Sequence, residues 1–347
     1  MLKWLLLLSL ALAPAAALAA PPPITVTPIS WHGWPQAVKL SNGVVEAVVV
    51  PQIGRVMAFE FAGHPETNPL YENPDWTPAK NHLPKSGEWA NYGGDKVWPA
   101  PQSDWPRFIG RDFPPDRSFD GLPEIVHLLP NGLRLSSPTS TEFGLHVERT
   151  ITLRPGQPRL FLTQMLARTL PGVAPDRSLA VWGITQVTGD GLFVLPLPSL
   201  AAARTSPFPL GYQSLSSPPV APPFWRVTTV GNRRVLLGRR DPANSHKVAT
   251  KARDGWLVHV SDTGIVFTEH SPVISGGVYP DDNSPGEVYS NAGASNYLEM
   301  ETLGPLTPVR PGQSLTTQIV WHLSRLPAAP ADDSEAADAA VRAAANF

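Results

Sequence analysis

The sequence contains no cysteine, so the protein has neither disulfides nor thiol chemistry. Charged residues are also scarce, at 16% of the chain, and the net charge is −2. Proteins that bind nucleic acid usually carry a basic patch, so this charge balance predicts no nucleic-acid partner. Beyond the N-terminal region no stretch is apolar enough for a membrane helix, and we expect no membrane insertion.

Several catalytic and metal-binding patterns are missing as well. The nine histidines show neither an HExxH motif nor any other close ligand spacing. There is no GxSxG nucleophile elbow, and the glycines form no phosphate-binding loop. The sequence therefore predicts no metal site and no cofactor.

The N-terminal segment predicts export. Lys3 supplies a positive start, residues 5–12 form an apolar run, and Ala17-Leu18-Ala19 is a small-x-small cleavage signal. This order is typical of a signal peptide, here residues 1–20, and the apolar run is shorter than the roughly 20 residues that span a bilayer. A large exported protein without disulfides depends on an extensive core and suits a bacterial periplasm. We expect a periplasmic or secreted protein.

Proline and tryptophan, by contrast, are abundant, with 41 and 11 residues. Proline interrupts helices, so this content favours strands joined by long loops. Short strand-like runs recur from Val44–Val50 to Ser314–Leu323, and the last run alternates strictly between two faces. The pattern predicts an all-β sandwich or barrel, formed as a single domain over residues 24–326. Residues 327–347 are predicted to be a flexible, Ala-rich tail with a short helix at Glu335–Ala344.

The segment from Asn91 to Gln102 is the strongest candidate site. It reads Asn-Tyr-Gly-Gly-Asp-Lys-Val-Trp-Pro-Ala-Pro-Gln, and its paired glycines let the backbone approach a ligand closely. Amide, carboxylate and ammonium groups beside an aromatic ring are the mixture that binds sugars. The candidate ligand-binding residues in this segment are Asn91, Asp95, Lys96, Trp98 and Gln102. The alternative is a tight turn with a capped aspartate and a core tryptophan.

A second candidate site lies near the C-terminus. A strand period of two places Tyr297, Glu299 and Glu301 on one face, with the two carboxylates about 7 Å apart at a rise of ~3.3 Å per residue. Repulsion between them should raise the pKa of one, which suits an acid/base pair. The alternative is an ordinary solvated strand face. His270 follows Glu269 at a strand end, where active-site residues often occur, and we include it as a candidate ligand-binding residue.

In this order the segments resemble the galactose-mutarotase-like (aldose 1-epimerase-like) superfamily. Residues 40–56, with a Gly-Arg turn at Arg55, resemble its opening strands, and residues 300–323 resemble its closing pair. With the Asn-x-Gly-Gly-Asp-Lys-x-Trp block, the chain most closely resembles a bacterial family of exported mutarotase-like domains of unassigned function. The resemblance implies a β-supersandwich whose region from Trp76 to Trp105 folds over one concave face, and it adds Arg55 to the candidate ligand-binding residues.

The resemblance also assigns catalytic positions. Glu301 falls where the superfamily has its general base, with Glu299 as the register alternative. The superfamily's acid is a histidine in a central strand, but the matching segment, Leu179–Val187, contains none. Trp182, Thr185 or Gln186 would occupy that position, and Trp182 is another candidate ligand-binding residue. Because mutarotation needs both an acid and a base, the resemblance does not predict classical mutarotase activity.

Two functions remain open. We favour a periplasmic carbohydrate-binding protein without turnover, because a fold does not specify chemistry. The alternative is a carbohydrate-active enzyme, an epimerase or a glycoside-processing enzyme, with Glu301 as base and Lys96, Asp95 or His270 as acid. In both cases the partner is a sugar or oligosaccharide, and we expect a monomer.

Overall fold

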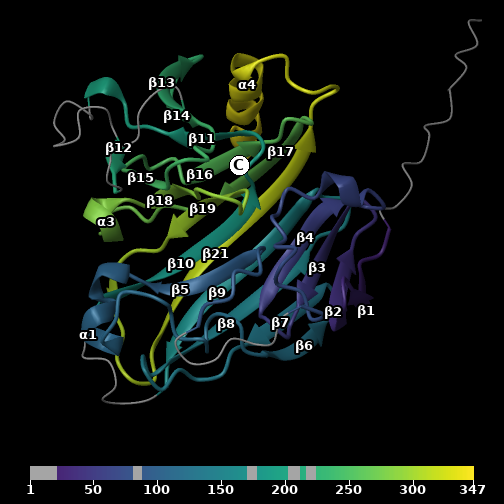
Figure 1. Cartoon of the computed structure of the whole chain (residues 1–347), viewed down its shortest axis with the longest axis vertical. Coiled ribbons are helices and arrows are strands. Elements are labelled where there is room, and N and C mark those ends of the chain that lie inside the picture. The colour runs from purple at the N-terminus through teal and green to yellow at the C-terminus, as the bar shows by residue number, and fades with distance from the viewer. Residues whose placement is uncertain (1–21, 81–87, 170–177, 202–211, 216–223) are drawn as a thin grey trace, which may run out of the picture.

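The computed structural model describes residues 22–80, 88–169, 178–201, 212–215 and 224–347, so the predicted signal peptide lies outside the described residues. Strands dominate this part of the chain and form three sheets (Figure 1). The all-β sandwich predicted from the sequence is confirmed.

The first sheet has four antiparallel strands in chain order. They are β1 (Thr25–Trp31), β2 (Trp34–Ser41), β3 (Val45–Val50) and β4 (Arg55–Phe61). The turn between β2 and β3 forms because the side chain of Asn42 accepts hydrogen bonds from the backbone N–H of Val44 and Val45, both at 2.9 Å. Gly43 follows at a φ of +79°, a conformation that favours glycine.

The largest sheet has ten strands in the order β13-β14-β11-β16-β17-β21-β9-β8-β7-β6. Their bounds are β6 (Ile125–Leu129), β7 (Gly132–Ser136), β8 (Leu145–Leu153), β9 (Arg159–Arg168), β11 (Leu192–Pro196), β13 (Trp225–Val230), β14 (Arg233–Gly238), β16 (Trp256–Val260), β17 (Ile265–His270) and β21 (Ser314–Arg325). Alternation along β8 and β9 buries every second residue. Four of those residues, Ile151, Leu153, Leu160 and Leu162, join a core to which all three sheets contribute and which includes Leu40, Phe59, Met300 and Trp321.

The third sheet carries the candidate site. Its order is β12-β15-β18-β19-β10-β20, and a further strand, β5, pairs with β10. The bounds are β5 (Asp95–Ala100), β10 (Ser178–Thr188), β12 (Tyr212–Ser214), β15 (His246–Thr250), β18 (Gly286–Ser290), β19 (Tyr297–Leu303) and β20 (Thr307–Pro308). The interior of β10 is buried on both faces, because the core covers one face and the aromatic side chains around β5 cover the other.

Helices are few among the described residues, and none of them has the length and apolar character needed to cross a membrane. They are η1 (Pro65–Thr67), η2 (Gln102–Asp104), α1 (Trp105–Ile109), α3 (Pro280–Asn283) and α4 (Asp333–Ala344). The sequence predicted a flexible tail over residues 327–347, whereas the structure packs α4 onto the ten-stranded sheet beside β16 and β17. Its buried alanines allow this close approach, and Asp332 caps its first turn by accepting from the backbone N–H of Ser334 at 2.8 Å.

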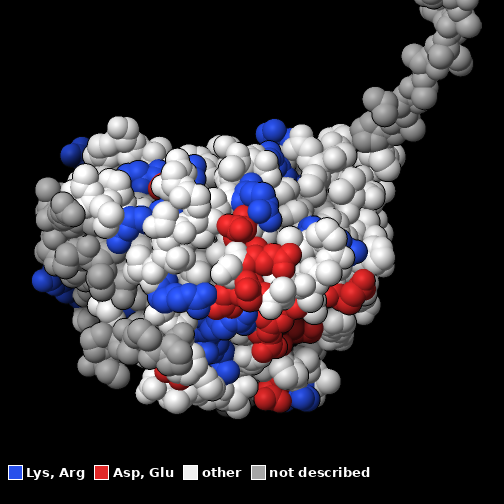
Figure 2. Space-filling model, turned by 90° about the horizontal axis from the view of Figure 1, so that it is seen from above, with Lys and Arg blue, Asp and Glu red and all other residues white. Residues whose placement is uncertain are grey.

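The end of the molecule that is uppermost in Figure 1 has a mixed electrostatic surface. Figure 2 looks onto this end and shows acidic side chains gathered near its middle, with basic side chains beside them. Ion pairs hold α4 to its neighbours: Asp333 lies 2.7 Å from Arg226 and 2.8 Å from Arg239. Half-exposed pairs of this kind each contribute at most about 1 kcal/mol.

Candidate functional site

One face of the third sheet gathers chemically active side chains from five strands. Strand register aligns Lys247, Tyr289, Glu299 and Gln186 as successive cross-strand neighbours on β15, β18, β19 and β10. A second row aligns Glu287 and Glu301 with Ile184 and Lys96. Cross-strand neighbours point to the same side of a sheet, so both rows share one face.

A cavity of about 460 Å³ lies over this face. It is lined by Trp89, Lys96, Trp98, Gln102, Phe113, Trp182, Leu215, Ser245, His246, Lys247, Tyr289, Asn291, Tyr297, Glu299 and Glu301. This size lies within the range of roughly 300–1,000 Å³ that is usual for small-molecule sites. The structure therefore brings together seven of the residues that the sequence singled out: Lys96, Trp98, Gln102, Trp182, Tyr297, Glu299 and Glu301.

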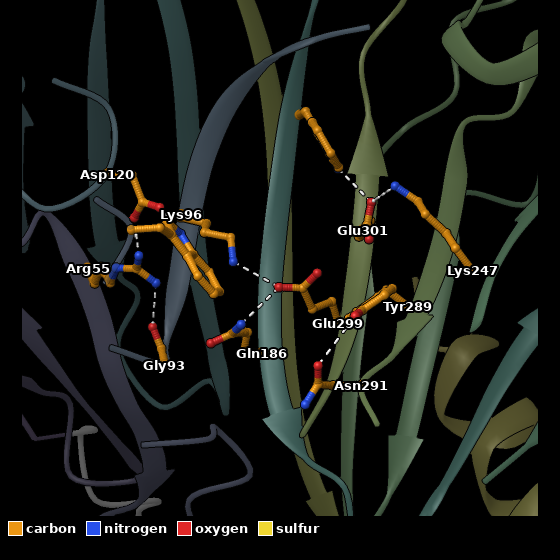
Figure 3. Close-up of polar contacts among 12 residues, drawn as sticks. Arg55, Gly93, Lys96, Asp120, Gln186, Lys247, Tyr289, Asn291, Glu299 and Glu301 are labelled. Atoms are coloured by element: carbon orange, nitrogen blue, oxygen red, sulfur yellow. Dashed lines mark hydrogen bonds and ion pairs between the residues drawn. The ribbon is translucent and has the colours of Figure 1, made fainter. Parts of the chain in front are cut away.

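Glu299 stands at the centre of this face, held by two donors (Figure 3). Lys96 Nζ lies 2.8 Å and Gln186 Nε2 2.9 Å from the same oxygen, Oε1. Burial alone would raise the pKa of Glu299, but the Lys96 ammonium and the two hydrogen bonds outweigh it and lower the pKa. No described residue donates to Oε2, so one oxygen of an ionised carboxylate is available to a ligand.

Glu301 is also held through one oxygen, but its pKa shifts in the opposite direction to that of Glu299. Its Oε2 accepts from Trp182 Nε1 at 2.7 Å and lies 2.8 Å from Lys247 Nζ. The same ammonium lies 2.8 Å from Glu287 Oε2. Burial and the charge of Glu299 raise the pKa of Glu301 in spite of Lys247. Burial would lower the pKa of Lys247 itself, but the carboxylates of Glu287 and Glu301 outweigh it and raise the pKa.

Aromatic rings form the wall on the β5 side of the cavity. Trp98 and Trp182 are cross-strand neighbours and meet edge to face at 5.4 Å. Lys96 Nζ lies 4.8 Å from the centre of the Trp98 ring, and Lys247 Nζ lies 4.4 Å from that of Trp182. Trp98 is only 5% exposed and also packs on Trp105. It belongs both to the core and to the cavity wall, the two roles that the sequence left open.

The Gly-Gly-Asp turn leads directly into β5, and the carbonyl of Gly94 accepts from the backbone N–H of Gln186 on β10. Gly93 and Gly94 have φ of +94° and +63°. Arg55 Nη1 donates to the carbonyl of Gly93 at 2.7 Å, and Asp95 accepts from the backbone N–H of Val56 at 2.7 Å. Asp95 also forms a buried ion pair with Arg149. Arg55 and Asp95, both sequence candidates for ligand binding, therefore hold the turn that precedes Lys96 and do not line the cavity.

Two further candidates also lie away from the cavity lining. Asn91 is buried in the segment that leads to this turn. His270 ends β17 in the ten-stranded sheet, where its ring stacks on Phe347 at 4.9 Å. His270 therefore contacts the C-terminal segment instead of the cavity.

The sequence interpretation missed Lys247, Tyr289 and Glu287. Lys247 lies on a short strand, His246–Thr250, that reads His-Lys-Val-Ala-Thr, and the other two lie on Gly286–Ser290, which reads Gly-Glu-Val-Tyr-Ser. Strands this short, without a strict polar–apolar alternation, carry little pattern from which a polar face could be predicted. Nor does the pattern reveal which distant strand lies alongside, so the pairing of Glu287 with Glu301 could not be predicted from the sequence.

Comparison with known proteins identifies the fold. The sequence matches no family model and no curated protein sequence. The structure is similar to a candidate aldose 1-epimerase from Escherichia coli K12, with a TM-score of 0.51 and 11% identity over 87% of this chain and 100% of that one. It is also similar to a candidate aldose 1-epimerase from Klebsiella pneumoniae, with a TM-score of 0.51 and 9% identity over 93% of this chain and 87% of that one. At these identities the similarity shows the fold alone, and the expected galactose-mutarotase-like β-sandwich is confirmed.

Proposed function

We propose that this protein binds a carbohydrate in the cavity over β5, β10, β18 and β19. The observation that carries the proposal is the pairing of aromatic walls with two anchored carboxylates, Glu299 and Glu301. Each carboxylate is held through one oxygen, and the other can accept from a ligand hydroxyl. Tryptophan faces cover the apolar C–H faces of a sugar ring. Both kinds of group are fixed before binding, which limits the entropy lost on association.

Two further considerations support the proposal. The similar solved structures are described as candidate aldose 1-epimerases, which act on sugars. The N-terminal pattern around Lys3 favours export, and we include a periplasmic or secreted location in the proposal.

A second candidate function, sugar acid–base catalysis, is favoured by the opposite pKa shifts of Glu299 and Glu301. Two carboxyl groups whose environments separate their pKa values are the usual arrangement for one base and one acid. The lowered pKa of Glu299 suits the base, and the raised pKa of Glu301 suits the acid. The resemblance placed the base at Glu301 with Glu299 as the register alternative, and the electrostatics favour Glu299 as the base.

Two measurements on one panel of hexoses, pentoses and their disaccharides test both candidates. Thermal unfolding reports binding, and exchange between anomers by NMR reports catalysis. Stabilisation without exchange supports the binding protein. Exchange that Glu299→Gln abolishes supports the enzyme, with Glu46→Gln on β3 as a control outside the cavity. The proposed function is wrong if no sugar on the panel stabilises the protein and none exchanges between anomers faster with the protein than without it.

A further inference from the structure

An exposed aromatic ring stands at the rim of the cavity. Phe113 lines the cavity, yet it is 46% exposed. Its ring meets Trp89 edge to face at 5.4 Å, and Trp89 lines the same wall. The two rings form an aromatic rim, here defined as Trp89 and Phe113.

The loop that carries Phe113 is fixed on both sides of the ring. Gln102 Nε2 donates to the carbonyl of Asp112 at 2.9 Å, and Arg111 Nε donates to the carbonyl of Pro114 at 2.9 Å. Arg111 is itself fixed by two hydrogen bonds to Glu142, at 3.0 and 2.7 Å. Ordering a loop costs conformational entropy, and a ring left half in water recovers little of that cost by burial. A fixed, exposed ring at a cavity mouth instead suits contact with a ligand.

Trp89 is held equally firmly. Its Nε1 donates to Asp120 Oδ2 at 2.8 Å, and Asp120 forms a buried ion pair with Arg55. Figure 3 shows Asp120 and Arg55 on the β5 side of Glu299, with Lys247 on the opposite side. Arg55, which lies outside the cavity lining, thus acts through Asp120 to orient the rim.

The cavity is also larger than one sugar requires. A hexose unit occupies about the volume of six or seven water molecules, or roughly 200 Å³ at ~30 Å³ per water. The cavity of about 460 Å³ therefore has room for two units. Its charged groups, Lys96, Lys247, Glu299 and Glu301, lie on the strands of the sheet, whereas the rim of Trp89 and Phe113 offers ring faces.

Resting on the proposed function, we propose that the natural ligand contains at least two linked sugar units. One unit contacts the carboxylates of Glu299 and Glu301. The adjoining unit stacks on the aromatic rim, where Phe113 selects for chain length. Phe113 is accordingly a specificity-determining residue that a free monosaccharide does not use.

Calorimetric titration of the full chain tests this proposal. The probes are D-glucose and D-galactose against maltose, cellobiose and lactose. We expect at least one disaccharide to bind more tightly than its component monosaccharides. Phe113→Ala should weaken disaccharide binding by about 5- to 10-fold and leave monosaccharide binding within twofold. Phe113→Tyr, which keeps the ring, should retain disaccharide affinity. Ile125→Ala, at a 66% exposed position on the edge strand β6, is the matched control and should change neither affinity.

The outcomes separate this inference from the proposed function. If monosaccharides bind and no disaccharide binds more tightly, the chain-length inference is overturned while sugar binding stands. The same holds if Phe113→Ala weakens both ligand classes equally. If no probe binds the wild-type protein, both proposals fail. Thermal unfolding of each variant checks that the substitution leaves the fold intact.

Discussion

Glu287 on β18 and Glu301 on β19 are direct cross-strand neighbours, and both carboxylates lie 2.8 Å from the single ammonium of Lys247. Two like charges opposite each other on a sheet destabilise it unless a cation compensates them. All three side chains are largely buried, so water screens them little. The cation on β15 thus stabilises the carboxylates that stand side by side on β18 and β19.

Lys247→Met should therefore destabilise the protein by about 3–5 kcal/mol at pH 8, because it leaves two buried carboxylates without a cation. The loss should be smaller at pH 5. Without Lys247 the folded-state pKa values of Glu287 and Glu301 rise further above their unfolded values, so stability falls as pH rises toward them. Urea unfolding at both pH values measures this difference.

The double variant Lys247→Met with Glu287→Gln should recover part of the stability, because only one carboxylate remains uncompensated. Lys39→Met is the surface control: its Nζ lies 3.4 Å from Glu46 in a half-exposed pair, and its removal should cost less than about 1 kcal/mol. Equal losses for Lys247→Met at pH 5 and pH 8 would contradict this electrostatic account.

Glu269 should make the protein less stable as the pH rises. Burial raises the pKa of Glu269 from its ordinary value of 4.5 to about 8, and the nearby carboxylate of Asp95 adds to the shift. The folded state then binds one more proton than the unfolded state between these values, so this contribution to stability is lost as the pH rises from about 4.5 to about 8.

Glu269→Gln keeps the shape of the protonated side chain and cannot ionise. The variant should match the wild type at pH 4.5 and should lose less stability by pH 8. Chemical denaturation at several pH values across this window provides the comparison. Parallel stability curves for the two proteins would show that Glu269 does not titrate there.

Gly93→Ala should cost more than about 4 kcal/mol of folding free energy, since it combines strain with a backbone clash. Gly93 has a φ of +94°, and an added Cβ would lie 2.1 Å from the carbonyl oxygen of Tyr71. Gly63→Ala is the matched control, because Gly63 has a φ of +75° but open space around its Cβ. Its cost should be only the left-handed strain, about 1–2 kcal/mol. Similar costs for the two variants would mean that the turn relaxes around the new methyl group.

Trp98→Ala should cost about 3–5 kcal/mol of stability, as expected for a buried aromatic side chain that packs on Trp105 and Trp182. It should also weaken sugar binding by about 1–3 kcal/mol per folded molecule, because the cavity loses part of its wall. Trp31→Ala, in the four-stranded sheet away from the cavity, controls for loss of a tryptophan as such. Denaturant unfolding and ligand titration on the same samples separate the two effects. Unchanged affinity would assign Trp98 to the core alone.

The sequence could predict the strands and the shared face of Glu299 and Glu301, because both follow from a period of two along one strand. The same rule shows why Asp95 was misplaced. Asp95 and Lys96 are adjacent in β5, so they must face opposite sides of the sheet, and only Lys96 reaches the cavity. Grouping them by composition overlooked this constraint.

Other features depend on contacts that the sequence pattern does not encode. His270 ends a strand, as active-site residues often do, but the strand belongs to a different sheet from β19. The role of α4 was equally hidden, because an Ala-rich segment resembles a loose extension until a matching flat surface on β16 and β17 is known.

Residues along β19 alternate between the core and the cavity, so substitutions in this strand fall into two classes. Leu298 and Met300 face the core, while Tyr297, Glu299 and Glu301 face the cavity. A one-residue slip would bring carboxylates into the core, so the correct register is strongly enforced. Substitutions on the cavity side leave the packing of Leu298 and Met300 untouched, and their cost falls instead on the ion pairs of Glu299 and Glu301. One scaffold can thus acquire a different ligand through a few point changes at odd-numbered positions of β19, provided that the charges of Lys96 and Lys247 stay compensated.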